Sequence, residues 1–307
     1  MIPPTIVPPD SSLDSQPQAP ASLTASRPFY WSVRRELWEN RSLYIAPLIV
    51  TALVLFATSL GMLTLLGRAG KLPEDSVVKL VLERLIFVPA PIMLATLLVG
   101  LFYSLDALYG ERRDRSLLFW KSMPVSDRTT VLSKASIPIV VLPLIAFVLS
   151  LATFVILMFL GIPLLLILGV SPATVWAKVR FFEEPSLMLY GLTVHAFWFA
   201  PIYAWLLLVS AWARRTPVLW AALPFVAVSV VERTAFHTSY FGALLKYRVT
   251  GAMTEAFGGM PKRGDPGALG LLTPVRFLCA PGLWVGLALA AAFLAIAVRL
   301  RRNREPI

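Results

Sequence analysis

Cysteine and histidine are nearly missing from this sequence of 307 residues. It holds one cysteine, Cys279, and two histidines, His195 and His237. A single cysteine excludes an intrachain disulfide and any site built from several cysteine ligands. A zinc site of the H-E-x-x-H type is excluded too, because it needs two histidines one helical turn apart. The sequence therefore predicts no metal site and no catalytic residues of these kinds.

A phosphate-binding loop is also missing. The one Gly-Lys pair, Gly70-Lys71, is followed by Leu72 and lacks the upstream glycine that such a loop needs. We expect no nucleotide site and no cofactor in this chain.

Long apolar runs dominate the sequence. Hydrophobic residues make up 57% of it and the mean hydropathy is +0.74, too apolar for a single water-soluble core. Several runs reach the roughly 20 residues that cross a bilayer as a helix. We predict an all-α membrane protein with six transmembrane helices at about 43–67, 85–109, 136–160, 187–211, 216–231 and 281–299.

Two of these runs have unusual lengths. The stretch from Ser136 to Gly169 exceeds one span and contains Gly161 and Pro163, so we expect the chain to bend there and continue as an interfacial helix. The fifth run is too short for an unperturbed bilayer, so the segment after it is expected to help fill that depth.

The net charge of +11 reflects the membrane rather than a nucleic-acid partner, because no basic helix or aromatic strand pattern accompanies it. Lysine and arginine gather before the first run, between the second and third, between the fourth and fifth, and after the last. Basic loops stay in the cytoplasm, so we expect a protein of the bacterial inner membrane with both termini on its cytoplasmic side.

The segments outside the spans have distinct compositions. Residues 1–26 are rich in Pro and Ser and predict a disordered cytoplasmic tail. Residues 27–42 interleave aromatic and charged side chains, which favours an interfacial helix, with a continuous extension of the first span as the alternative. The long outer loop 232–280 is expected to hold short re-entrant or interfacial helices, and residues 300–307 form a basic cytoplasmic tail. The six-helix domain occupies 43–299.

The loop at 110–135 is the most informative segment. Charged residues fill 111–115, and Leu117, Leu118 and Trp120 then supply an apolar side, as in a short amphipathic helix parallel to the membrane. Pro124 ends that helix, since proline cannot continue its hydrogen-bond ladder.

This loop resembles that of the ABC-2 family of exporter permeases, the membrane subunits of ATP-binding cassette exporters. The family's loop has a Glu, a charged pair, Gly-Thr, a Leu-rich turn, Thr-Pro-Val-Ser and a later Lys. The matching positions are Glu111, Ser116 in place of Thr, Pro124-Val125-Ser126 and Lys134, whereas Arg115 replaces Gly and Met123 replaces Thr.

The resemblance implies a mechanical role. In that family the loop docks on a cytoplasmic ATPase subunit, which binds ATP and Mg, and the permease pairs with itself or with a related permease in the lipid bilayer. The residues expected to couple to the ATPase are Glu111, Arg112, Arg113, Asp114, Arg115, Ser116 and Pro124. The alternative is a solvated charged loop that only fixes topology.

Three residues within the spans are candidates for a substrate path: Asp106, His195 and Tyr203. An ionisable group in a membrane helix is costly and therefore suggests function. Asp106 could instead be hydrated or paired with Arg112 or Arg113, and His195 could serve helix packing.

Two other classes of function stay open. A nonenzymatic membrane scaffold or assembly factor would have no ATPase partner. An intramembrane enzyme is disfavoured by the scarcity of metal ligands. The substrate of an exporter is not specified by these residues, although the apolar content favours an amphipathic or hydrophobic cargo.

Overall fold

The computed structural model describes residues 26–67, 73–114, 125–179, 181–258 and 272–303, and every regular element within these ranges is helical. Six of the helices are long and apolar enough to cross a membrane. The predicted all-α membrane protein with six candidate spans is confirmed at this level. The tail predicted for residues 1–26 lies outside the described residues up to Ala25.

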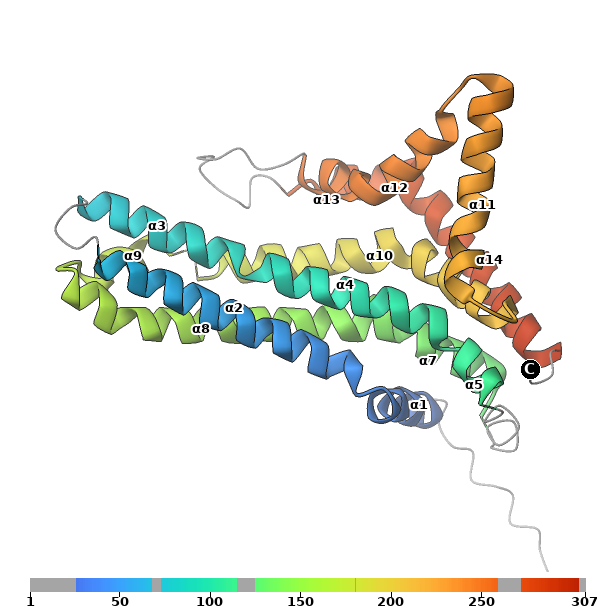
Figure 1. Cartoon of the computed structure of the whole chain (residues 1–307), viewed down its shortest axis with the longest axis horizontal. Helices are drawn as coiled ribbons and strands as arrows, with labels where there is room; N and C mark the ends of the chain where they lie inside the picture. The colour runs from blue at the N-terminus through green and yellow to red at the C-terminus, as the bar shows by residue number, and fades with distance from the viewer. Residues whose placement is uncertain (1–25, 68–72, 115–124, 180, 259–271, 304–307) are drawn as a thin grey trace, which may run out of the picture.

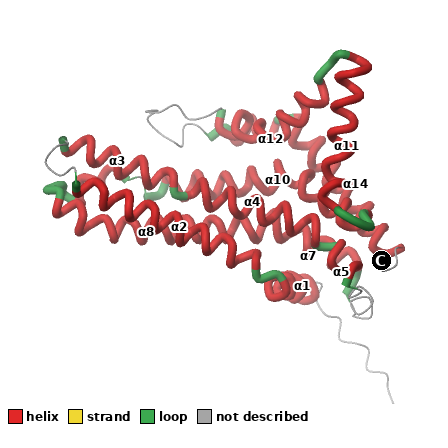
Figure 2. Tube along the Cα trace, in the orientation of Figure 1, coloured by secondary structure: helices red, strands yellow, loops and turns green. Residues whose placement is uncertain are grey.

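The helices follow one another with short connections (Figures 1 and 2). Their bounds are α1 Ser26–Glu39, α2 Ser42–Leu66, α3 Glu74–Phe87, α4 Pro89–Asp106, α5 Tyr109–Arg113, α7 Asp127–Ser136, η1 Ile137–Val141, α8 Leu142–Ile167, α9 Pro172–Lys178, α10 Glu183–Trp212, α11 Pro217–Val231, η2 Glu232–Phe236, α12 Tyr240–Phe257, α13 Pro274–Cys279 and α14 Pro281–Asn303. The elements η1 and η2 are π-helical turns.

The bundle is formed by α2, α4, α8 and α10, which run side by side, with α14 packed along α10 (Figure 1). The largest apolar cluster joins α2, α3, α4, α8 and α9 through residues such as Val78, Ile92 and Leu157. Three small residues, Ala200, Ala204 and Ala290, bring α10 and α14 close together. Small side chains at such a contact allow the close backbone approach that membrane helices use for packing.

The second and third spans are longer than predicted. In the second span, the amphipathic helix α3 directly precedes α4. In the third span, α7 runs through η1 into α8. In both cases polar helical turns extend the span beyond its apolar run. The helix α8 continues through Gly161 and Pro163 to Ile167, and the short helix α9 follows only after Gly169. The third span therefore does not end near residue 160. Packing against neighbouring helices lets a membrane helix tolerate an internal proline.

The helix α1 is separate from α2, with Asn40 and Arg41 between them. It lies across one end of the bundle, where α5, α7 and the end of α14 also gather (Figure 1). Trp31 and Trp38 are exposed, and the Arg34 guanidinium lies over both rings. The alternative of one continuous helix is wrong.

At the far end of the sequence, α14 extends to Asn303 and buries Arg301. The predicted tail 300–307 is therefore helical at its start. Residues 304–307 lie outside the described part.

The helix α11 projects away from the bundle (Figure 1), whereas α12 packs against α10 through an apolar cluster that contains Trp198, Ala252 and Ala256. α11 buries only Ala221, and η2 prolongs it to Phe236, which makes up for its short apolar run. The Glu232 carboxylate accepts backbone N–H bonds from Tyr240 at 2.6 Å and Phe241 at 3.0 Å, which fixes the start of α12. α12 is one helix of 18 residues instead of several short ones.

Candidate functional site

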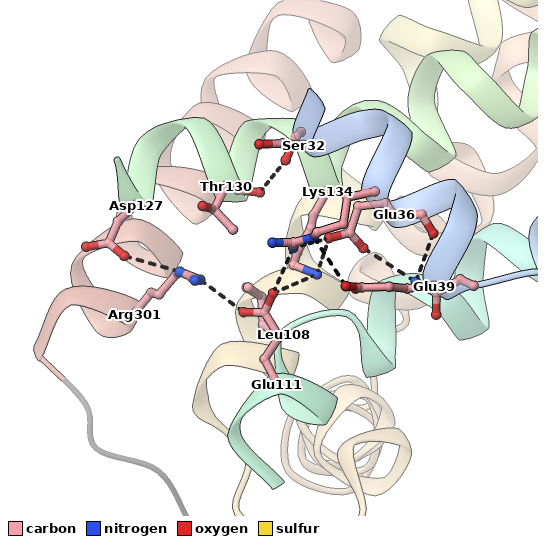
Figure 3. Close-up of polar contacts among 12 residues, drawn as sticks. Ser32, Glu36, Glu39, Leu108, Glu111, Asp127, Thr130, Lys134 and Arg301 are labelled. Atoms are coloured by element: carbon pink, nitrogen blue, oxygen red, sulfur yellow. Dashed lines mark hydrogen bonds and ion pairs between the residues drawn. The ribbon is translucent and has the colours of Figure 1, made fainter. Parts of the chain in front are cut away.

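A cluster of six charged residues joins four helices at the end of the bundle that carries α1 (Figure 3). Its members share salt bridges and are mostly buried; they are Arg35, Glu36, Glu111, Asp127, Lys134 and Arg301. We call this set the ion cluster.

Glu36 is the most deeply buried member, with no exposed surface. Its carboxylate accepts hydrogen bonds from Lys134 Nζ at 2.8 Å, Arg35 Nη2 at 2.7 Å and Tyr103 Oη at 2.8 Å. Burial raises the pKa of this carboxyl, but Lys134 and Arg35 outweigh it and leave the pKa below its usual value. Glu36 is therefore an ionised group that ties α1 to α4 and α7.

Glu111 is the second hub of the cluster. Its Oε1 lies 3.1 Å from Lys134 Nζ and 3.3 Å from Arg35 Nη2, and its Oε2 lies 3.0 Å from Arg301 Nη1. Arg301 also reaches Asp127 at 3.2 Å. Glu111 thus contacts α1, α7 and α14 at once.

The neighbouring Arg112 is turned inward as well. It is 4% exposed, and its Nη2 donates to the carbonyl oxygens of Ser210 at 2.7 Å and Ala213 at 2.6 Å. Ser210 Oγ in turn accepts the backbone N–H groups of Leu108 and Tyr109, each at 2.9 Å. These bonds satisfy the free carbonyls at the end of α10 and fasten α5 to that end.

The predicted coupling residues therefore divide into two groups. Glu111 and Arg112 are internal connectors, whereas Arg113 and Asp114 pair with each other at 3.0 Å with side chains 57% and 62% exposed. Arg115, Ser116 and Pro124 lie outside the described residues. On the far side of the loop, Ser126 Oγ caps α7 by accepting the N–H of Thr129.

Five residues of this site were not predicted as site residues from the sequence: Arg35, Glu36, Tyr103, Asp127 and Arg301. A signal existed in α1, where Glu36 lies one turn after buried Ser32, between Val33 and Leu37 of the apolar side. A carboxylate on the packed face of an amphipathic helix requires a partner, but the sequence does not say which basic residue provides it.

The three candidates for a substrate path do not share one cavity. Asp106 is exposed and lines a cavity of about 250 Å³ with Asn40, Phe102 and Tyr103 at the end of α4 nearest α1. The cavity beside His195 is a different one, and Asp106 is not among its lining residues.

His195 and Tyr203 do come together, with Nε2 and Oη 3.2 Å apart. The His195 ring also interacts with the backbone carbonyl of Pro138 in η1. π-Helical turns free such carbonyls and are frequent at functional sites. His195 lines a largely apolar cavity of about 260 Å³ with Met93, Thr96 and Pro143.

Among the residues that the structure describes, no three of His, Cys, Asp and Glu are grouped as a metal site. Comparisons of the chain with models of known protein families, with curated proteins and with solved structures found no match. Function must therefore be inferred from the chain's own residues.

Proposed function

We propose that this chain is the membrane subunit of an ATP-driven exporter of the ABC-2 type. The observation that carries the proposal is the set of contacts made by the loop residues Glu111 and Arg112. Glu111 forms buried ion pairs with α1, α7 and α14, and Arg112 donates hydrogen bonds to backbone carbonyls at the end of α10. Both residues lie in the loop on which an ATPase would act. A displacement imposed on the loop would thus move several helices together.

The exposed part of the loop would meet the ATPase. The Arg113 and Asp114 side chains are exposed and form a salt bridge with each other, and among the described residues neither is in a salt bridge to another helix. An exposed charge pair on a short helix suits recognition by a soluble subunit, because rim charges set specificity and association rate. In this arrangement docking and transmission are separate tasks of adjacent residues.

The ATPase, ATP and Mg would be supplied by a separate cytoplasmic subunit. The end of the bundle with α1, α5, α7 and the end of α14 would face the cytoplasm of a bacterial cell, in line with its many basic residues. A second copy or a related permease would complete the complex in the bilayer. The cavity beside His195 is apolar, which favours an amphipathic or hydrophobic cargo.

The test is a mild-detergent pull-down of the tagged chain from its native membrane, assayed for a co-purifying ATPase. Arg113→Glu should reduce the recovered ATPase about tenfold, as expected when a charged contact of an interface is reversed. The matched control is Arg214→Glu, which reverses the charge of another exposed arginine, in the α10–α11 connection. It should leave recovery unchanged.

Two results would speak against the proposal. Equal recovery of the ATPase with Arg113→Glu and with the unaltered chain would remove the docking role. Recovery of the unaltered chain without an ATPase, under conditions that preserve known complexes, would favour a membrane scaffold or assembly factor.

A further inference from the structure

Arg248 lies on α12, where this helix contacts Trp198 of α10 and Gly282 of α14. The helix α12 is remote from α1 and α5 (Figure 1). Its backbone carbonyl accepts a hydrogen bond of 2.8 Å from Trp198 Nε1, and its guanidinium lies 4.9 Å from the centre of the Trp198 ring. Its Nη1 donates to the carbonyl of Gly282 at 2.9 Å. The main chain and the side chain of Arg248 are thus both held in place.

Two glycines of α14 make room for this arrangement. A Cβ atom at Gly286 would lie 2.6 Å from Arg248 Cζ, and one at Gly282 would lie 2.7 Å from Tyr247 Cε1. Only glycine permits contacts this close, because real Cβ atoms do not approach other atoms so nearly. The guanidinium is therefore enclosed between an indole ring and bare helix backbone.

The charge of Arg248 has no counter-ion among the described residues. The nearby carboxylate Glu255 is engaged by Arg276 at 3.2 Å and by Tyr247 Oη at 3.4 Å. Arg248 Nε and Nη2 are buried without a hydrogen-bond acceptor in the described part of the chain. Burial accordingly lowers the pKa of Arg248, opposed only by Tyr247.

A buried donor without an acceptor is unfavourable, and a buried cation without an anion more so. The first turn of α14, which carries Gly282, adds the partial positive charge of a helix N-terminus. An anion bound at this point would compensate both the buried guanidinium charge and the partial positive charge of the helix N-terminus.

The surroundings indicate what kind of anion fits. Exposed apolar side chains flank Arg248 on both helices: Leu244 and Val249 on α12, and Trp284 and Val285 on α14. A ligand held here would place an acidic group on the arginine and an apolar chain along these side chains. A membrane phospholipid has this form, and arginine binds phosphate through paired N–H groups.

We propose that Arg248, framed by Trp198 and Gly286, binds the phosphate of an anionic phospholipid headgroup. Nε and Nη2 are buried against α14 in this structure, so binding would turn the guanidinium outward from Gly286 to bring these N–H groups to a phosphate oxygen; the side chain as a whole is only partly buried. The site does not depend on whether an ATPase joins the complex.

The test is native mass spectrometry of the purified full chain titrated with phosphatidylglycerol or with phosphatidylcholine. Arg248→Gln should weaken phosphatidylglycerol binding about tenfold, the loss expected for one charge-assisted bidentate contact. Phosphatidylcholine binding should fall less, because its choline cation offsets the charge of the phosphate. The control is Lys246→Gln, which removes the same charge from an exposed position of α12. It should bind both lipids as the unaltered chain does.

Equal phosphatidylglycerol binding by Arg248→Gln and the unaltered chain would overturn the site. If Arg248→Gln does not fold, Arg248→Lys replaces it; this variant keeps the charge but not the planar fork, and undiminished binding would again overturn the proposal. Inorganic phosphate is the second ligand. If it stabilises the unaltered chain through Arg248 while phosphatidylglycerol does not bind there, the anion is free phosphate and the lipid assignment is wrong.

Discussion

Arg301 in the last turn of α14 lies 3.0 Å from Glu111, which precedes it by 190 residues. The bond joins the final helix to the loop that follows α4, and the same carboxylate also contacts Lys134. The two ends of the described chain are thereby linked through one acidic side chain, since Arg35 of α1 meets Glu111 as well.

Loss of the Glu36 charge should destabilise the protein. Glu36→Gln leaves Lys134 and Arg35 partly uncompensated in a buried site, and breaking a buried pair in this way costs about 3 kcal/mol. The measurement is the thermal unfolding of the purified chain in detergent. Glu39→Gln on the same helix is the control; its side chain is half-exposed and should change stability little.

A double variant separates the charge from the packing. Replacing both partners, as in Glu36→Gln with Lys134→Met, removes the uncompensated ammonium and should be less unstable than Glu36→Gln alone. A single variant as stable as the unaltered chain would show that Glu36 is not held as an ion in the protein.

Acidification should weaken the ion cluster. The pKa of Glu36 in the folded chain is below its ordinary value of 4.5, so its contribution to stability is fully present above that value and is lost as the pH falls through the folded pKa. The pKa of Glu39 is raised, chiefly by burial, and its protonation acts in the opposite direction.

The measurement is the unfolding temperature from about pH 7 to about pH 3, compared between the unaltered chain and Glu36→Gln. The unaltered chain should lose more stability below about pH 4.5, and the two curves should converge. Parallel curves over the whole range would contradict the assigned direction.

Ser210→Ala should loosen the attachment of α5 to α10. The substitution removes the acceptor of two backbone N–H groups, those of Leu108 and Tyr109, and unsatisfied buried donors cost about 1–3 kcal/mol. Hydrogen exchange should become faster at both amides. Ser186→Ala is the matched control, because that exposed hydroxyl donates to the carbonyl of Phe182 one turn earlier and accepts no buried N–H group in the described part of the chain. Unchanged protection in Ser210→Ala would mean that Arg112 alone holds this junction.

The single cysteine offers a direct test of orientation. Cys279 is exposed at the end of α13, just before α14, and the proposed topology places it outside the cytoplasm. A membrane-impermeant maleimide should label the unaltered chain in cells with a permeabilised outer membrane. With Cys279→Ser, labelling should vanish.

The opposite side is tested in the same background. Arg128→Cys with Cys279→Ser places the only thiol on the exposed face of α7, and it should react only after lysis. Labelling of this variant in intact cells would show that the orientation of the chain is opposite to the proposed one.

The sequence predicted the helices better than it predicted their contacts. Apolar length located six spans, and the aromatic and charged mixture at 27–42 indicated a separate first helix, because both are local properties. The extensions α3 and α7 were missed since their polar turns carry no apolar signal. Glu36 and Lys134 are 98 residues apart, and their pairing depends on how α1 meets α7, which no local pattern records.

The same limit applies to Arg112 and Arg113. They are adjacent residues of the same type, yet Arg112 is buried against the end of α10 and Arg113 is exposed. Their difference follows from the facing of a short helix and from the free carbonyls at Ser210 and Ala213.

The π-helical turn between α7 and α8 takes up one extra residue within a single turn of helix. Each residue of a regular α-helix advances its side chains by about 100°, so deleting a residue from α7 or α8 would rotate one helix against the other by about that angle. Deleting one residue within 137–141 would instead convert the π turn into an α turn and leave that rotation nearly unchanged. Lys134 would keep its place between Glu36 and Glu111, and α8 its packing against α4, so this segment should tolerate the loss of one residue that the flanking helices should not.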